Sequence, residues 1–144
     1  MNRRRMMMGR GKTEPLLVFE YGKSALSNGR MTSGYGAAFL EGKIKINNAN
    51  GNGGYMNIGG IDFSGYKKLK IECYTDVLDY GIQREYHYCG YGKDEGSEKS
   101  DYTSFKYIPS SAETLEFDIG ATEGENFIKA CANSGMTIRN IRLE

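Results

Sequence analysis

The stretch "KKLKIECYT" (67–75) has the clearest periodicity in the chain. Apolar residues occupy every second position from Leu69 through Ile71 to Cys73, and lysine, glutamate or tyrosine stands at the positions between them. Successive side chains of a β-strand point to opposite faces, so this pattern predicts a strand with one face in a core and the other in solvent.

Weaker forms of this alternation recur on both sides of that stretch. In "EGKIKIN" (41–47), for example, Ile44 and Ile46 share one face. Helical periodicity nowhere extends beyond two turns, and the 20 glycines and 11 tyrosines favour short strands joined by tight turns. About ten strands predict an all-β protein, a sandwich or a barrel. Further strands are expected near 16–21, 35–40, 55–58, 81–92, 102–108, 113–119, 126–132 and 136–144.

The last of these segments, "MTIRNIRLE" (136–144), breaks its own alternation. Met136 and Ile138 share one parity, whereas Ile141 and Leu143 have the other. One extra residue near 139–140 would return all four to the core, which predicts a β-bulge there. The expected core of two antiparallel sheets contains Leu69, Ile71, Phe117, Ile119, Ile128, Ile138, Ile141 and Leu143.

Charge divides the chain into a basic start and a mildly acidic body. Residues 1–12, "MNRRRMMMGRGK", carry five basic residues and no acidic one, although the net charge of all 144 residues is +1. We therefore expect an extended arm over 1–13 and one β-sandwich domain over 14–144, with no specific nucleic-acid partner. The three methionines give way at once to "GRGK", so a cleavable signal is not expected, and no apolar run approaches the length of a membrane span.

Several kinds of site can be tested against the sequence. Cys73, Cys89 and Cys131 lack CxxC spacing and are odd in number, which predicts packed thiols without a disulfide, in a reducing compartment. The "GKT" at 11–13 lacks the glycine, strand and helix of a phosphate loop. His87 lies two residues from Cys89, so they could form a thiolate pair, but a packed pair in a strand is the simpler interpretation.

An acidic loop offers the only plausible metal ligands. Asp94, Glu95, Glu98 and Asp101 lie close together in it, but their spacing matches no EF-hand, so a solvated turn is expected rather than a Ca²⁺ site. No catalytic acid–base or nucleophile set is assembled, and we expect neither an enzyme nor a cofactor.

Tyrosines are the remaining signal. In "REYHYCGYG" (84–92), Arg84, Tyr86 and Tyr88 would share one strand face, with Glu85 and His87 on the other. Such a face could stack on a sugar or pack against a partner. The alternative is that these tyrosines fill the core of a protein that has no tryptophan.

Four features together suggest a family: the basic, methionine-rich start, "GGIDFSGYKKLKIE" (59–72), "FIKACA" (127–132) and the terminal "MTIRNIRLE". The chain resembles small β-sandwich proteins of bacteriophage and prophage structural gene clusters, which have a galactose-binding-like jelly roll. The resemblance implies a non-enzymatic, multi-copy or homo-oligomeric module that decorates the head or associates with the tail. It further implies capsid or tail proteins as partners, and a virion location after folding in the host bacterial cytoplasm.

In such a protein the basic start would be an arm that docks the sandwich on the virion; the alternative is a disordered end with no docking role. Its docking residues would be Arg3, Arg4, Arg5, Met6, Met7, Met8 and Arg10. The alternative function is a carbohydrate-binding module that recognises host surface polysaccharide, with Arg84, Tyr86 and Tyr88 as its platform.

Overall fold

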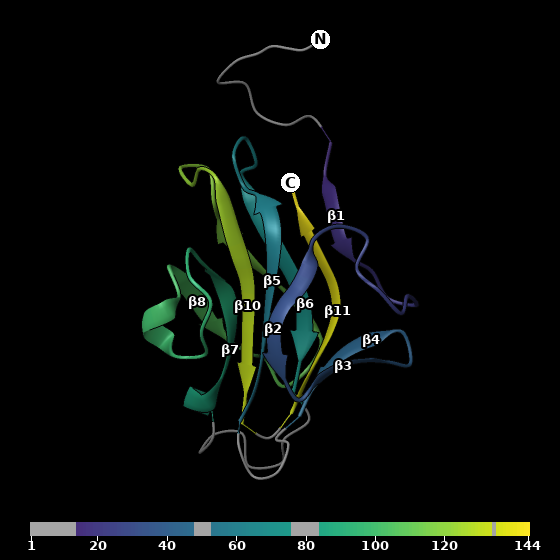
Figure 1. Ribbon diagram of the computed structural model, residues 1–144. Coiled ribbons are helices and arrows are strands. Elements are labelled where there is room, and N and C mark those ends of the chain that lie inside the picture. Colours follow the sequence, from purple (N-terminus) through teal and green to yellow (C-terminus); the bar gives the residue numbers. More distant parts are fainter. Residues whose placement is uncertain (1–13, 48–52, 76–83, 134) are drawn as a thin grey trace.

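The computed structural model describes residues 14–47, 53–75, 84–133 and 135–144, which form an all-β fold with two antiparallel sheets (Figure 1). Two short 3₁₀ helices complete it, η2 (Arg84–Tyr86) and η3 (Lys99–Asp101). The predicted fold class is confirmed. The strands are β1 (Leu16–Phe19), β2 (Arg30–Tyr35), β3 (Ala37–Leu40), β4 (Lys43–Ile46), β5 (Gly54–Asp62), β6 (Lys68–Tyr74), β7 (His87–Gly92), β8 (Ser104–Tyr107), β9 (Glu113–Asp118), β10 (Glu125–Ala132) and β11 (Met136–Leu143).

The strands divide into sheets that we call A and B. Sheet A has the order β3-β4-β11-β6-β9, and β1 also pairs with β11. Sheet B has the order β2-β5-β10-β7-β8. Apart from β3–β4 and β7–β8, neighbouring strands in both sheets are not consecutive in the sequence, so the fold depends mainly on long-range pairing. The inner faces of the two sheets pack against each other, and each sheet has an outer face on the other side.

The core confirms the alternation found in the sequence. All eight side chains expected in it are buried, from Leu69 and Ile71 on β6 to Ile141 and Leu143 on β11. Sheet B contributes Met56, Ile58, Ile128 and others to the same cluster.

The predicted bulge in β11 is also present. The pairing of β11 with β6 shifts register between Ile138 and Asn140, so one additional residue is accommodated at Arg139. Both halves of the strand therefore direct their apolar side chains inward, as the broken alternation required.

The expected strands differ from the structure at three main places. The single strand expected near 35–40 is replaced by β2 (Arg30–Tyr35) and β3 (Ala37–Leu40), which belong to different sheets and are separated by Gly36 at a φ of 72°. The strand expected over 55–58 continues to Asp62, because a register shift against β10 takes up Gly59 and Gly60, and Gly60 has a φ of 77° that favours glycine. The strand expected over 81–92 begins at His87, because Arg84–Tyr86 turn into the 3₁₀ helix η2. The register with β10 ends with Ala132 opposite His87, and beyond it the Tyr86 oxygen accepts from the Asn133 amide at 3.1 Å.

The proposed arm residues, Arg3 to Met8 and Arg10, lie outside the described residues. Among the described residues, no helix has the length and apolar character needed to cross a membrane.

Candidate functional site

A polar segment lies across the outer face of sheet B. Residues 93–103, here called the strap, connect β7 to β8 at one edge of the sheet and contain η3. The Glu95 carboxylate accepts hydrogen bonds from the hydroxyls of Thr32 and Ser33, the latter at 2.9 Å. Since β2 is the opposite edge strand, the strap spans the width of the sheet.

Lys129 anchors the strap from below. Its neighbours Ile128 and Ala130 belong to the core, so Lys129 points to the outer face, where the strap buries it completely. Its Nζ donates to Asn57 Oδ1 at 2.6 Å and to the backbone oxygens of Asp94 at 2.7 Å and Gly96 at 3.0 Å. All three ammonium protons therefore have acceptors.

The charge of Lys129 is under opposing influences. Burial lowers the pKa of this lysine, whereas the nearby carboxylates of Asp101, Glu95 and Asp94 act to raise it. The Nζ also lies 5.1 Å from the ring centroid of Tyr102, whose π face is a further favourable contact. Through its hydrogen bonds to Asp94 and Gly96, Lys129 thus fixes the position of the strap.

Two glycines of β7 let the strap and β8 approach closely. A Cβ atom at Gly90 would collide with the backbone oxygen of Ser104, and one at Gly92 would collide with that of Asp101. These positions therefore require glycine for space, not for an unusual backbone angle.

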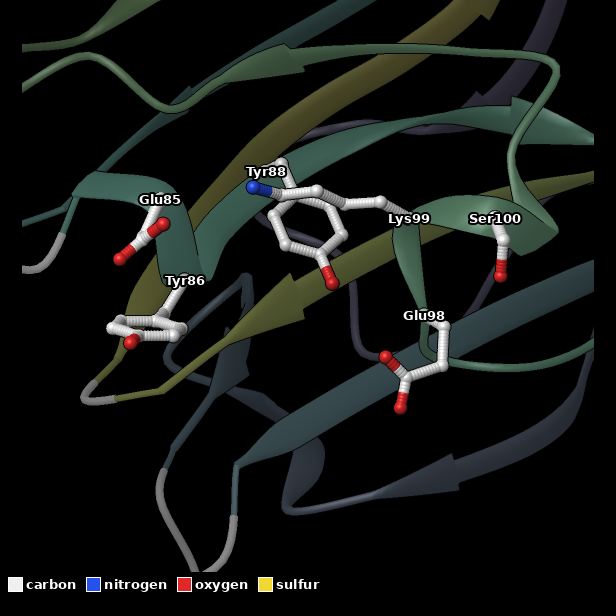
Figure 2. A pocket seen from close by; sticks show the side chains of 6 residues that line it. All are labelled: Glu85, Tyr86, Tyr88, Glu98, Lys99 and Ser100. Carbon is white, nitrogen blue, oxygen red and sulfur yellow. The ribbon is translucent and has the colours of Figure 1, made fainter.

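A hollow lies beside the strap, at the η2 end of β7. Its volume is about 310 Å³, and an adjoining hollow of about 220 Å³ shares three of its residues, Tyr86, Tyr88 and Glu98. Figure 2 shows the Tyr86 ring and the Glu98 carboxylate on two sides of the first hollow, with the Tyr88 hydroxyl between them. Glu85, Lys99 and Ser100 complete the first hollow, and Gly53, Ser97, Cys131 and Asn133 complete the second.

The two tyrosines of this hollow differ in their roles. Tyr86 is 51% exposed, so its ring is available to a ligand. Tyr88 is 6% exposed, and its hydroxyl donates to the Ser97 backbone oxygen at 2.8 Å. Burial, together with the neighbouring Cys131 and Glu98, raises the pKa of Tyr88, so the hydroxyl stays protonated and holds the strap.

Two cations cover the aromatic side chains next to the hollow. The Lys99 Nζ lies 5.4, 5.7 and 5.1 Å from the ring centroids of Tyr88, Phe105 and Tyr107 and donates to the Tyr107 hydroxyl at 3.2 Å. Arg84 lies 5.2 Å from the Tyr107 ring. These contacts leave Tyr86 as the ring that the hollow presents, with Glu85 and Glu98 as exposed hydrogen-bond acceptors.

The sequence-predicted platform is therefore divided. Tyr86 and Tyr88 line one hollow, but Arg84 lies in η2 against Tyr107 and does not line it. The sequence did not predict that Glu98 and Lys99 line the hollow, because local pattern does not show that this loop folds back against Tyr86 and Tyr88. Sequence reasoning also missed Lys129, although a lysine inside the apolar run "FIKACA" is itself a signal for a buried charge with partners.

The described residues do not form the thiolate pair that His87 and Cys89 could have made. His87 and Cys89 do share a face, but it is the inner one and both are buried. A hydrogen bond with Cys73 and burial raise the pKa of the Cys89 thiol, which opposes thiolate formation. All three cysteines are free thiols.

No group of three or more His, Cys, Asp or Glu side chains in the described part of the chain could hold a metal ion. The carboxylates of the strap have separate partners: Glu95 binds the hydroxyls of β2, and Asp101 accepts from the Glu98 amide at 3.1 Å.

Comparisons with known proteins bear on the fold. No family model matches the chain, and no curated protein matches it. Among solved structures, a variant of the carbohydrate-binding module CBM29-2 has a TM-score of 0.63 at 11% identity, with 92% of each chain covered. Another variant of that module, complexed with cellulohexaose, has a TM-score of 0.62 at 14% identity, covering 90% of this chain and 89% of the other.

CBM29_1, a family 29 carbohydrate-binding module from Piromyces equi, is also similar, with a TM-score of 0.57 at 14% identity over 90% of this chain and 89% of that one. At these identities the similarity shows a shared β-sandwich fold. The virion hypothesis stays a prediction.

Proposed function

We propose that this chain is a non-catalytic carbohydrate-binding module whose glycan packs against Tyr86 in the hollow beside the strap. The exposed Tyr86 ring carries this proposal, because it is the large apolar surface that the hollow offers. A flat ring edged by polar groups suits a sugar, which has apolar ring faces and hydroxyls around its rim.

The polar groups of the hollow support the same ligand class. Glu85 and Glu98 supply carboxylate acceptors, and Ser97, Ser100 and Asn133 supply groups that can donate or accept. The strap is held by Lys129 and Tyr88, so this wall is ordered before ligand binds. Preorganisation of this kind reduces the entropic cost of binding.

Two exposed tyrosines allow a matched test. Tyr86 and Tyr21 are each 51% exposed. Tyr21, however, lies on the sheet A side, where its ring centroid is 4.9 Å from Arg139 Cζ and 6.0 Å from Lys43 Nζ. Binding to cellohexaose, mannohexaose and bacterial wall polysaccharide would be measured by calorimetry. We expect Tyr86→Ala to weaken binding at least about tenfold, or about 1.4 kcal/mol, and Tyr21→Ala to leave it unchanged.

Equal losses in the two variants, or no binding by the wild-type chain to any member of the panel, would contradict the proposal. Cys131 offers a second readout, because it lines the hollow and is partly exposed, whereas Cys73 and Cys89 are fully buried. A bound glycan should slow alkylation of the Cys131 thiol in the native protein.

A further inference from the structure

The outer face of sheet B carries a row of aromatic residues that the sequence does not show. Residues directly opposite each other in neighbouring strands share a face. Tyr35 of β2 lies opposite Tyr55 of β5, and Tyr55 lies opposite Cys131 of β10. The row continues from Cys131 to Tyr88 of β7 and from Tyr88 to Tyr107 of β8. It crosses all five strands at right angles to their direction.

The strap lies mainly over the adjacent row, and its Ser97 and Lys99 contact this row only at Tyr88 and Tyr107, its β7–β8 end. The next residues along the strands on this face include Asn57, Lys129 and Gly90, again opposite one another. Asn57 and Lys129 bind the strap, and Gly90 lacks a side chain that would obstruct β8. The strap is therefore a wall parallel to the row of tyrosines.

The two ends of the row are not equivalent. At the β8 end, Lys99 and Arg84 cover the Tyr107 ring. Toward the other end, the second hollow reaches Cys131 and Gly53, and Gly53 stands two residues before Tyr55. Tyr55 and Tyr35 are partly exposed. Along this row, a ligand held at Tyr86 can thus extend toward β5 and β2.

We propose that the ligand is an extended linear oligosaccharide that runs from the Tyr86 hollow over Cys131 to a distal subsite formed by Tyr55 and Tyr35. This inference rests on the proposed function and adds the direction and length of the ligand. Since neighbouring strands are about 4.8 Å apart, the path from β7 to β2 measures roughly 14 Å, which is longer than one sugar ring. Because the Cys131 side chain is smaller than the tyrosines on either side of it, it does not obstruct the middle of this path.

The experiment compares long and short oligosaccharides with matched variants. Cellohexaose and mannohexaose, and the corresponding dimers, would be titrated into the wild-type chain, Tyr55→Ala and Tyr74→Ala. Tyr74 is also a partly exposed strand tyrosine, but it lies on the outer face of sheet A. We expect Tyr55→Ala to weaken binding of a hexamer about tenfold while dimer binding is unchanged, and Tyr74→Ala to change neither.

A Tyr55→Phe variant controls for folding, because it keeps the ring and should bind the hexamer as the wild type does. The melting temperature of each variant would be measured alongside. The inference is overturned if Tyr55→Ala leaves the hexamer-to-dimer ratio unchanged, or if neither hexamer binds while wall polysaccharide still binds through Tyr86. In both of these cases the proposed function itself stands. It fails instead if Tyr86→Ala has no effect on any glycan.

Discussion

The two outer faces of this sandwich use similar residues in opposite ways. On sheet A, Lys70 lies 2.9 Å from Glu144 and 3.8 Å from Glu116, and its side chain keeps contact with solvent. On sheet B, Lys129 has no exposed surface and is bound by one amide oxygen and two backbone oxygens. The difference lies in the strap, which covers the outer face of sheet B, whereas no described segment binds Lys70 on β6 in this way.

This contrast shows how one sheet of a sandwich becomes available for a binding site. A face with exchangeable ion pairs is a solvated surface, where each pair contributes little to stability. On sheet B, the buried and fully hydrogen-bonded Lys129 holds the strap in a fixed position. The row of tyrosines runs alongside the strap. Three comparisons of equivalent residues on the two faces test this difference.

The largest effect is expected from removing the lysine charge on each face. Lys129→Met leaves the Asn57 and Asp94 oxygens without their donor, so the free energy of unfolding should fall by about 2–3 kcal/mol. Lys70→Met should cost less than about 1 kcal/mol, as for other exposed ion pairs. Urea denaturation measures both, and proteolysis within the strap should increase only for Lys129→Met. Equal costs would mean that the strap does not depend on Lys129.

A smaller effect is expected from adding one methyl group beneath the strap. Gly92→Ala should displace the strap backbone near Asp101 and lower the free energy of unfolding by about 1–2 kcal/mol. The control is Gly120→Ala after β9 of sheet A, where an added Cβ comes no closer than 3.4 Å to the Asp118 carboxylate. Thermal unfolding of the two variants gives the comparison. A neutral Gly92→Ala would show that the strap can move away from β7.

The smallest effect concerns one surface glutamate on each face, Glu95 and Glu144. Hydrogen bonds from the neutral hydroxyls of Thr32 and Ser33 lower the pKa of Glu95, whereas Arg142 and Lys70 lower that of Glu144 on sheet A. A lowered pKa in the folded state means that each carboxylate stabilises the fold above its unfolded pKa, and that this contribution is lost as the pH falls through the folded pKa.

Salt should separate the two causes. Screening weakens charge pairs much more than hydrogen bonds to hydroxyls, so high salt should raise the pKa of Glu144 toward its ordinary value and move that of Glu95 less. Carboxyl titration by NMR at low and high salt measures this. Equal movement of both would show that Glu95 is held mainly by charge, from Lys129.

Most of the layered architecture could be predicted from local patterns. Alternation placed Leu69, Ile71 and the other core residues correctly, and the change of parity between Ile138 and Ile141 located the bulge. These predictions succeed because the side-chain period of a strand is a local property of the backbone. The extension of β5 through Gly59 and Gly60 was missed, because only pairing with β10 shows that the two glycines interrupt the strand without ending it.

By itself, the sequence determined the fold class, the burial of the core and the presence of tyrosines around 84–92. The tertiary structure alone decided which of those tyrosines is exposed, that Tyr35 and Tyr55 join Tyr88 in one row, and that a loop rich in carboxylates is a wall tied to Lys129. The physical reason is that strand order and register are set by contacts between residues far apart in the chain. Period and composition are read within a few residues, but the row from Tyr35 to Tyr107 is assembled across five strands.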